Sequence, residues 1–287
     1  MKVLFLHYAD YLEIGIPGGI SILSAVLKAH GHEVKVFDTT FMKRAGWENH
    51  SKSAGGFSIF KKTEYTLEDL VREDPVTDIL EEFKSTLARY NPDILAVSVM
   101  TANYDQALEL VKRAKPECLT IFGGVHPTIA PEEVINQAVV NMLCLGEGEE
   151  AIVELADGLQ NGNPIGEIKY LWTKTQKNRI VKNSFRKFTD LNSLPCPDWS
   201  VFDSRHLFRP FEGKVYRGSF VTSSRGCPGS CTYCVNMTIR NLFKGSGNYF
   251  RKANSKTFVS HLRRLKGEYG ATWFKFADDT FLLRSTR

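Results

Sequence analysis

The feature that most constrains the fold is a regular alternation of short apolar runs with helix-like stretches over the first 160 residues. The apolar runs have the length and composition of strands buried on both faces. They lie at residues 2–6, 33–38, 94–99, 120–122 and 142–145. Helical periodicity follows at 20–29, at 66–90, at 104–115, from Pro131 onward and at 149–159. Five such β–α units predict an α/β fold with a doubly wound parallel sheet in the flavodoxin-like strand order 2-1-3-4-5.

One long connection interrupts this alternation. Residues 39–65 are rich in glycine and are predicted to form an irregular insertion. Thr66 is predicted to cap the following helix, because its hydroxyl can accept from the first free backbone N–H groups. Pro75 interrupts that helix, which is predicted to resume and end at Tyr90.

The ends of the third and fourth strands are candidate ligand contacts, since open α/β sheets bind ligands at the carboxyl ends of their strands. Ser98 closes the third strand, and Gly123 and Gly124 close the fourth. The glycines would let a bulky flat or branched ligand approach the backbone, and Ser98 is small and offers a hydroxyl. A Gly-Gly pair after a parallel strand is also common as a tight turn, so these residues alone leave both interpretations open.

These strand ends resemble the Ser-x-Leu and Gly-Gly parts of the cobalamin-binding domain pattern. Here they are Ser98-Val-Met100 and Gly123-Gly-Val-His-Pro127, and a later Gly146-Glu-Gly-Glu149 is similar to what B12 domains carry when they precede a radical S-adenosylmethionine (SAM) barrel. The resemblance implies a bound cobalamin whose nucleotide tail lies between these strand ends. The implied contacts are Ser98, Gly123, Gly124, Val125 and His126.

One departure from the B12 pattern concerns the cobalt. Domains whose histidine binds cobalt carry Asp-x-His-x-x-Gly after the first strand, whereas here His7 precedes Asp10 and no glycine matches. His7 is therefore not assigned as a cobalt ligand.

Simpler roles also exist for the other motifs. His126 can bond a backbone carbonyl, and residues 146–149 can be a helix N-terminus with favourable acidic residues.

Three of the six cysteines form a compact metal-binding motif. Cys227, Cys231 and Cys234 have Cys-x3-Cys-x2-Cys spacing on a loop that contains Gly and Pro. Thiolates are soft ligands, and an iron–sulfur cube held by three of them leaves one iron open. A structural zinc site normally has four ligands, but no Cys or His follows until His261. A disulfide would leave one thiol over and needs an oxidising compartment.

The spacing, with Tyr233 before the last cysteine, resembles the signature of the radical SAM superfamily. The resemblance implies a [4Fe-4S] cluster on Cys227, Cys231 and Cys234, with SAM on the fourth iron and Tyr233 against its adenine. Asp278 and Asp279 end a later strand, where the family holds the methionine amino group of SAM. An Asp-rich turn is the alternative there.

The second half is predicted to begin a partial (β/α) barrel. Strand-like runs at 215–222 and 272–277 flank a helix at 255–269, and the cysteine loop follows the first run, as barrel chemistry requires. A β-hairpin, with strands at 168–173 and 179–182, and a proline-rich stretch at 194–199 precede it. The predicted domains are 1–165 (cobalamin-binding type), 166–212 (hairpin and linker) and 213–287 (radical SAM part). Only about two βα units follow residue 215, so we expect either that the chain is a fragment truncated within the barrel or that a partner completes the barrel.

Charge and cysteine use bound the partners. Residues 1–150 contain 14 Lys and Arg against 22 Asp and Glu, whereas residues 151–287 contain 23 against 10. The basic half could meet an anionic substrate or nucleic acid, but a solvated face or a partner surface is the preferred interpretation. The chain lacks a signal-like start and an apolar run long enough for a bilayer. We therefore expect a cytoplasmic protein with reduced thiols and no membrane partner.

Together these features predict a cobalamin-dependent radical SAM enzyme. The family resemblance implies that SAM is cleaved to a 5′-deoxyadenosyl radical and that a methyl group passes from methylcobalamin to carbon on a small molecule. It also implies a reducing partner such as flavodoxin or ferredoxin. Alternatives are a cyclase or rearrangement enzyme of the porphyrin-cyclase type, and a cofactor-binding fragment without turnover. A tRNA modifier with a second cluster is disfavoured, because Cys118, Cys144 and Cys196 do not align with one.

Overall fold

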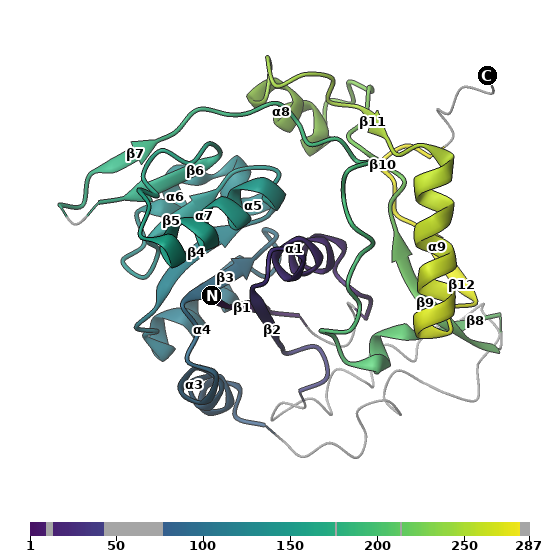
Figure 1. Cartoon of the computed structure of the whole chain (residues 1–287), viewed down its shortest axis with the longest axis horizontal. Helices are drawn as coiled ribbons and strands as arrows, with labels where there is room; N and C mark the ends of the chain where they lie inside the picture. The colour runs from purple at the N-terminus through teal and green to yellow at the C-terminus, as the bar shows by residue number, and fades with distance from the viewer. Residues whose placement is uncertain (10–13, 43–76, 176, 213, 282–287) are drawn as a thin grey trace.

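The chain is built on a seven-stranded sheet in the order β2-β1-β3-β4-β5-β6-β7 (Figure 1). The computed structural model describes residues 1–9, 14–42, 77–175, 177–212 and 214–281. Strands β1 to β5 are parallel, so the α/β class and the order 2-1-3-4-5 are confirmed. Residues 43–65 of the predicted insertion, the Thr66 cap, Pro75 and Asp10 lie outside the described residues. The strands are β1 Lys2–His7, β2 Glu33–Asp38, β3 Ile94–Ser98, β4 Leu119–Gly123, β5 Met142–Cys144, β6 Leu171–Lys174 and β7 Ile180–Lys182.

Helices cover both faces of this sheet (Figure 1). Helices α1 and α7 pack together on one face, and α3 and α4 pack together on the other. The caps explain some of their bounds: Asp78 accepts from Leu80 N and Glu81 N to start α3, and Asn91 ends it in the left-handed conformation. The helices are α1 Gly18–Ala29, α3 Ile79–Tyr90, α4 Tyr104–Ala114, α5 Val125–Ile129, α6 Pro131–Ile135 and α7 Glu149–Asn161.

The core lies on both sides of β1 and β3. Four consecutive residues of β1, Val3 to Leu6, are at most 1% exposed, as a strand with helices on both faces requires. Burying a side chain of this size contributes about 1.5–3 kcal/mol. Such strands therefore stabilise the seven-stranded sheet with its helices, which we call the first unit. No helix in the described parts of the chain is both long and apolar enough to cross a bilayer.

The predicted hairpin is present, and it extends the sheet. β6 pairs antiparallel with β5, and β7 pairs antiparallel with β6. The sequence indicated the hairpin from its turn residues but not its docking on β5, because strand pairing depends on contacts far apart in the chain.

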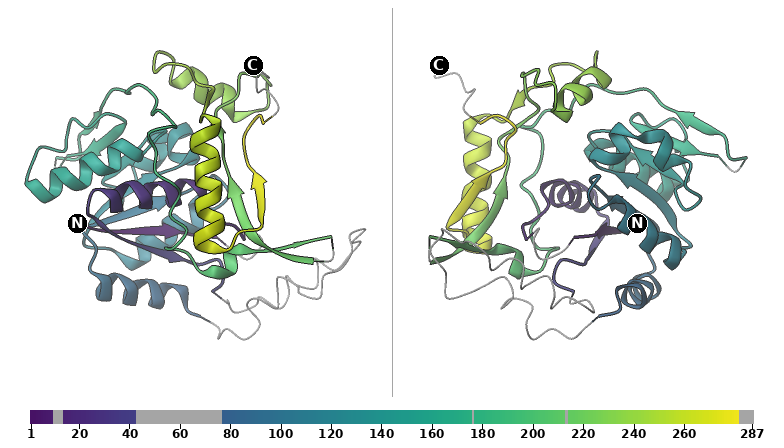
Figure 2. Two further views of the ribbon diagram at one scale, coloured as in Figure 1. Left: turned by 45° about the vertical axis from the view of Figure 1, so that its right-hand side comes forward. Right: turned by 180° about the vertical axis from the view of Figure 1, so that it is seen from behind.

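The part of the chain that follows the proline-rich stretch at 194–199, which we call the second unit, contains a three-stranded sheet in the order β12-β9-β8 (Figure 2). β12 (Trp273–Phe276) is parallel to β9 (Lys214–Val221), and helix α9 (Ser255–Tyr269) connects them, as the predicted strand–helix–strand unit requires. Asn254 caps α9, and Gly270 ends it with φ +64°. Elements the pattern did not predict are η3 Ser204–Leu207, β8 Phe208–Phe211, β10 Ser224–Arg225, α8 Val235–Leu242 and β11 Arg251–Lys252. The proposed boundaries at 165 and 212 stay predictions.

Candidate functional site

A recess lies at the carboxyl ends of β3, β4 and β5. Its volume is about 450 Å³. Ser98, Gly123 and Gly124, three of the predicted cobalamin contacts, line it together. Cys144, Gly146 and Gly148, which the sequence did not assign to it, complete much of its wall. Burial raises the pKa of the Cys144 thiol to about 12, so this residue is an inert apolar wall.

The two glycines of β4 and α5 have different reasons to be glycine. Gly124 has φ +105° and ψ −168°, a region that only glycine adopts readily, and a Cβ there would lie 2.4 Å from Val99 O. A Cβ on Gly123 would meet only Cys144, at 3.7 Å or more. A longer side chain at Gly123 would therefore extend into the recess, so this is an open cradle of the kind that a bulky flat or branched group needs.

Val125 and His126 are placed differently from the other three. Neither lines the recess. The His126 ring stacks on Tyr104 with centroids 4.1 Å apart, and its Nδ1 lies 3.1 Å from Thr101 Oγ1. Its Nε2 is 3.6 Å from Glu133 Oε1, which is beyond hydrogen-bonding distance. The structure thus gives His126 protein neighbours on both sides of its ring.

His7 is buried at the end of β1 and does not line the recess. Burial lowers its pKa, and the negative charge of Asp38 opposes that effect without outweighing it. Asp38 Oδ2 lies 2.5 Å from His206 Nε2, and His206 Nδ1 accepts from Gly15 N at 3.2 Å. These contacts tie the end of the first sheet to η3 and leave His7 unassigned as a ligand.

The cysteine loop runs from β10 to α8 and is held by polar contacts. Arg240 of α8 donates to Pro228 O at 2.9 Å, to Gly229 O at 3.2 Å and to Ser230 Oγ at 3.0 Å. A guanidinium suits this task because its planar donors can meet several oxygens at once. The contacts fix the segment between the first two cysteines.

Each of two cysteine sulfurs has a donor beside it. Cys227 Sγ lies 3.0 Å from Thr280 Oγ1 and accepts from Gly229 N at 3.4 Å. Cys234 Sγ accepts from Asn236 Nδ2 at 3.8 Å. Hydrogen bonds to sulfur favour the thiolate, and around a cluster they tune its potential.

The three thiols of the loop are not in disulfides, and the space between two of them is open. All six cysteines are free, so the disulfide loop is not observed. A Cβ on Gly229 would lie 3.3 Å from Cys227 Sγ and 3.9 Å from Cys231 Sγ, so this glycine keeps the space between them open. Among the described residues, no three His, Cys, Asp or Glu side chains converge on one metal-ion position.

The predicted SAM contacts differ in their exposure to solvent and in their hydrogen bonds. Tyr233 is 92% exposed on the loop. Asp278 Oδ1 accepts from Ser223 N at 3.0 Å and Ser223 Oγ at 2.8 Å, and also from Ser224 Oγ. Asp278 therefore joins the end of β12 to the end of β9.

Asp279, in contrast, is exposed. Burial raises the pKa of Tyr249 to about 12, and the negative charges of Asp279, Cys234 and Cys227 add to the rise. The next residue, Thr280, has its Oγ1 3.0 Å from Cys227 Sγ, so the segment that carries Asp279 passes beside the first cysteine.

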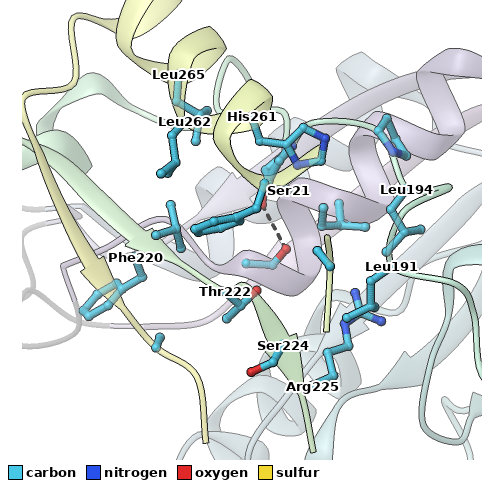
Figure 3. Close-up of a pocket in the computed structure, with 18 of the residues that line it drawn as sticks. Ser21, Leu191, Leu194, Phe220, Thr222, Ser224, Arg225, His261, Leu262 and Leu265 are labelled. Carbon is cyan, nitrogen blue, oxygen red and sulfur yellow. Dashed lines mark hydrogen bonds between the residues drawn. The ribbon is translucent and has the colours of Figure 1, made fainter. Parts of the chain in front are cut away.

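A second cavity, of about 840 Å³, lies between α1, the linker and α9 (Figure 3). In Figure 3, His261, Leu262 and Leu265 come from α9, Leu191 and Leu194 from the linker and Ser21 from α1. None of the predicted site residues lines this cavity. Its lining is mainly apolar, but it includes Ser224 and Arg225, which lie just before the cysteine loop.

Comparison with known proteins agrees with this geometry. Residues 58–156 match the B12 binding domain family. The chain is 24% identical, over 96% of its length, to a cytidylyl-2-hydroxyethylphosphonate methyltransferase of Streptomyces wedmorensis, of which it covers 53%. It is 25% identical, over 76% of its length, to an anaerobic magnesium-protoporphyrin IX monomethyl ester cyclase of Cereibacter sphaeroides, of which it covers 35%.

Two solved structures share the fold. The cobalamin-dependent SAM radical enzyme OxsB, with aqua-cobalamin and SAM bound, superposes with a TM-score of 0.67 at 16% identity, over 98% of this chain and 34% of that one. The radical SAM methyltransferase TsrM from Kitasatospora setae, with cobalamin and a [4Fe-4S] cluster bound, gives 0.62 at 16% identity, over 97% and 47%. The chain thus spans about half, or less, of the length of these proteins.

Proposed function

We propose that this chain, which is a B12-binding-domain-containing radical SAM protein by its domain match, relatives and fold, holds cobalamin in the recess and a [4Fe-4S] cluster on Cys227, Cys231 and Cys234. The whole protein would be a methyltransferase acting on carbon. The observation that carries the proposal is that the glycine-walled recess and the three-cysteine loop occur in one chain and are joined directly through residues 146–149 and Arg225.

The cofactors, when bound, would supply the radical and the methyl group, and the chain would bind, orient and shield them. Asp279 is exposed, and the next residue, Thr280, contacts Cys227 Sγ, so the Asp279 carboxylate would accept from the ammonium of SAM. Tyr233 would lie against the adenine, and Asp278 would order the strand ends below. Arg240 would hold the loop in shape.

A second candidate is ring formation of the porphyrin-cyclase type, because the relatives include cyclases as well as methyltransferases. The cofactor set would be the same, so only product analysis separates the two. A reducing protein such as flavodoxin or ferredoxin would supply the electron in both cases. A chain that binds the cofactors without turnover would release no 5′-deoxyadenosine under a strong chemical reductant.

The test is anaerobic reconstitution with iron, sulfide and cobalt quantified on the same sample. We expect about four irons and one cobalt per chain. The variant C227S/C231S/C234S should lose the iron and its broad visible absorbance but keep the cobalt. Cys118→Ser, which changes a half-buried cysteine outside the loop, is the matched control and should keep both. One zinc per chain in place of iron would reject the proposal.

A further inference from the structure

The segment Gly146-Glu-Gly-Glu149 has two sides. Gly146 and Gly148 line the recess. Glu147 and Glu149 instead contact arginines of the second unit. The glycine at 146 is required by both conformation and space, because it has φ +80° and a Cβ there would lie 2.6 Å from the Phe243 ring. One short stretch of backbone is therefore shared by the recess and the interface.

Glu147 is at the centre of the interface. Its Oε1 lies 2.5 Å from Arg251 Nη2 and 3.0 Å from Arg225 Nη1. Its Oε2 accepts from Arg251 Nη1 at 3.0 Å and from Thr189 N at 3.0 Å. Glu149 adds one contact, from its Oε1 to Arg225 Nη2 at 2.5 Å. Charge-assisted, two-pronged contacts of this kind fix both distance and orientation.

The arginines sit where they can position the cysteine loop. Arg225 is in β10, two residues before Cys227, and it pairs directly with Arg251 of β11. Like charges opposite each other in an antiparallel pair are destabilising on their own. Glu147 contacts both guanidinium groups and compensates that repulsion. The small β10–β11 sheet thus depends on a carboxylate from the end of β5.

These ion pairs are largely shielded from solvent, so breaking one of them should cost more stability than breaking an exposed pair. The side chains of Glu149 and Glu147 are 6% and 12% exposed, and those of Arg251 and Arg225 are 16% and 26% exposed. Removing one partner from such a set leaves another charge buried without compensation, which costs more than losing a surface ion pair. Burial alone would raise the pKa of Glu147, but hydrogen bonds and charges from Arg251 and Arg225 outweigh it and hold the pKa below its usual value.

We propose that Glu147 is a positioning residue that sets the cysteine loop at a fixed place relative to the recess, through Arg225 and Arg251. This inference depends on the proposed function, in which the recess would hold cobalamin and the loop would hold the cluster. Glu149 supports Arg225 in the same arrangement. The segment does not touch the reacting atoms; it fixes where the two cofactors stand.

The chain offers a matched control. On the next turns of α7, Glu150 Oε2 and Glu154 Oε1 each lie 2.7 Å from Arg186 Nη1, and the Arg186 side chain is 10% exposed. This second cluster joins α7 to the segment after β7 and involves neither arginine of the β10–β11 sheet. Glu154→Gln therefore removes a carboxylate from a second arginine cluster, on α7, without touching the interface; this carboxylate is 49% exposed, against 12% for Glu147.

The first experiment uses the cofactor-free chain. In Glu147→Gln, amide hydrogen exchange at residues 223–227 and 251–252 should accelerate about tenfold or more, because these strands lose their compensating charge. Glu154→Gln should leave exchange there unchanged. Unchanged exchange in Glu147→Gln would overturn the proposal. If Glu147→Gln does not fold, Arg251→Lys keeps the charge but loses the fork, and should show the same acceleration in weaker form; no acceleration in it would equally overturn the proposal.

The second experiment uses the reconstituted chain and reads distance rather than turnover. Reduced cluster and cob(II)alamin each carry an unpaired electron, so their magnetic interaction in electron paramagnetic resonance reports their separation. Glu147→Gln should keep iron and cobalt but show a weaker and broader interaction, and Glu154→Gln should match the wild type. An unaltered interaction would overturn the proposal. If the wild type binds neither metal, the proposed function fails, while the exchange experiment still tests Glu147.

Discussion

The two units of the molecule are stabilised in different ways. In the first, β1 places four consecutive residues at 1% exposure or less inside a helix-covered sheet. In the second, α8 has no buried residue, and Phe276 of β12 is 40% exposed. This unit also buries apolar side chains such as Phe258 and Leu265, and polar contacts add to that packing, from Arg240 to the cysteine loop and from Asp278 to Ser223. The recess is therefore preformed by packing, whereas the cysteine loop is held mainly by polar contacts.

The largest test of this contrast is to remove the thiols. C227S/C231S/C234S should abolish cluster binding and destabilise the second unit of the reconstituted protein, because metal binding and folding are coupled. The urea transition of the first unit should not move. Iron content and urea unfolding followed by circular dichroism measure the two effects. A shift of both transitions by the same amount would show that the units do not differ in this way.

A smaller effect is expected from Gly124→Ala in the preformed unit. Its backbone conformation and the contact with Val99 O should cost about 3 kcal/mol of unfolding free energy. Gly123→Ala, whose Cβ meets only Cys144, is the control and should cost less than about 1 kcal/mol. Urea titration of both variants gives the comparison, and equal costs would contradict the assignment of Gly124.

Substituting Asp278 and Asp279 tests whether they have different roles in the second unit. Asp279→Asn should weaken SAM binding about tenfold or more, since a carboxylate bonded to an ammonium is lost. Asp278→Asn should instead lower stability, because its Oδ1 accepts from Ser223 and Ser224. Equilibrium dialysis with SAM on the reconstituted protein, beside a urea titration, separates the two effects. Weaker SAM binding in Asp278→Asn together with lower stability in Asp279→Asn would contradict these assignments.

The smallest expected effect is the pH dependence of the bridge between the units. The pKa of Glu147 is lowered in the folded chain, so its contribution is present above the ordinary value of about 4.5 and is lost as pH falls below it. The stability difference between wild type and Glu147→Gln should therefore shrink from pH 6 towards pH 3.5. Both proteins share the buried His7, so the comparison isolates Glu147. A difference that stays constant with pH would contradict a charge-based bridge.

Burial explains how much the sequence could predict. The parallel order, the hairpin strands and α9 follow from apolar periodicity and caps, and all are observed. Ser98 and Gly123 were found as strand ends, and the cysteines by spacing alone.

The sequence could not predict what long-range polar contacts decide. Gly146-Glu-Gly-Glu149 was noticed only as a resemblance and as a helix start, because its partners Arg225 and Arg251 lie 76 or more residues away. The difference between Asp278 and Asp279 likewise depends on Ser223, which no local pattern connects to them.

The strict alternation of small and acidic residues in 146–149 has a consequence for how this region can change. Gly146, with φ +80°, and the start of α7 at Glu149 fix the path of the backbone between them, so deleting or inserting one residue there would move Glu147 away from Arg225 and Arg251. This stretch should therefore keep its length in functional descendants even where the composition around it drifts.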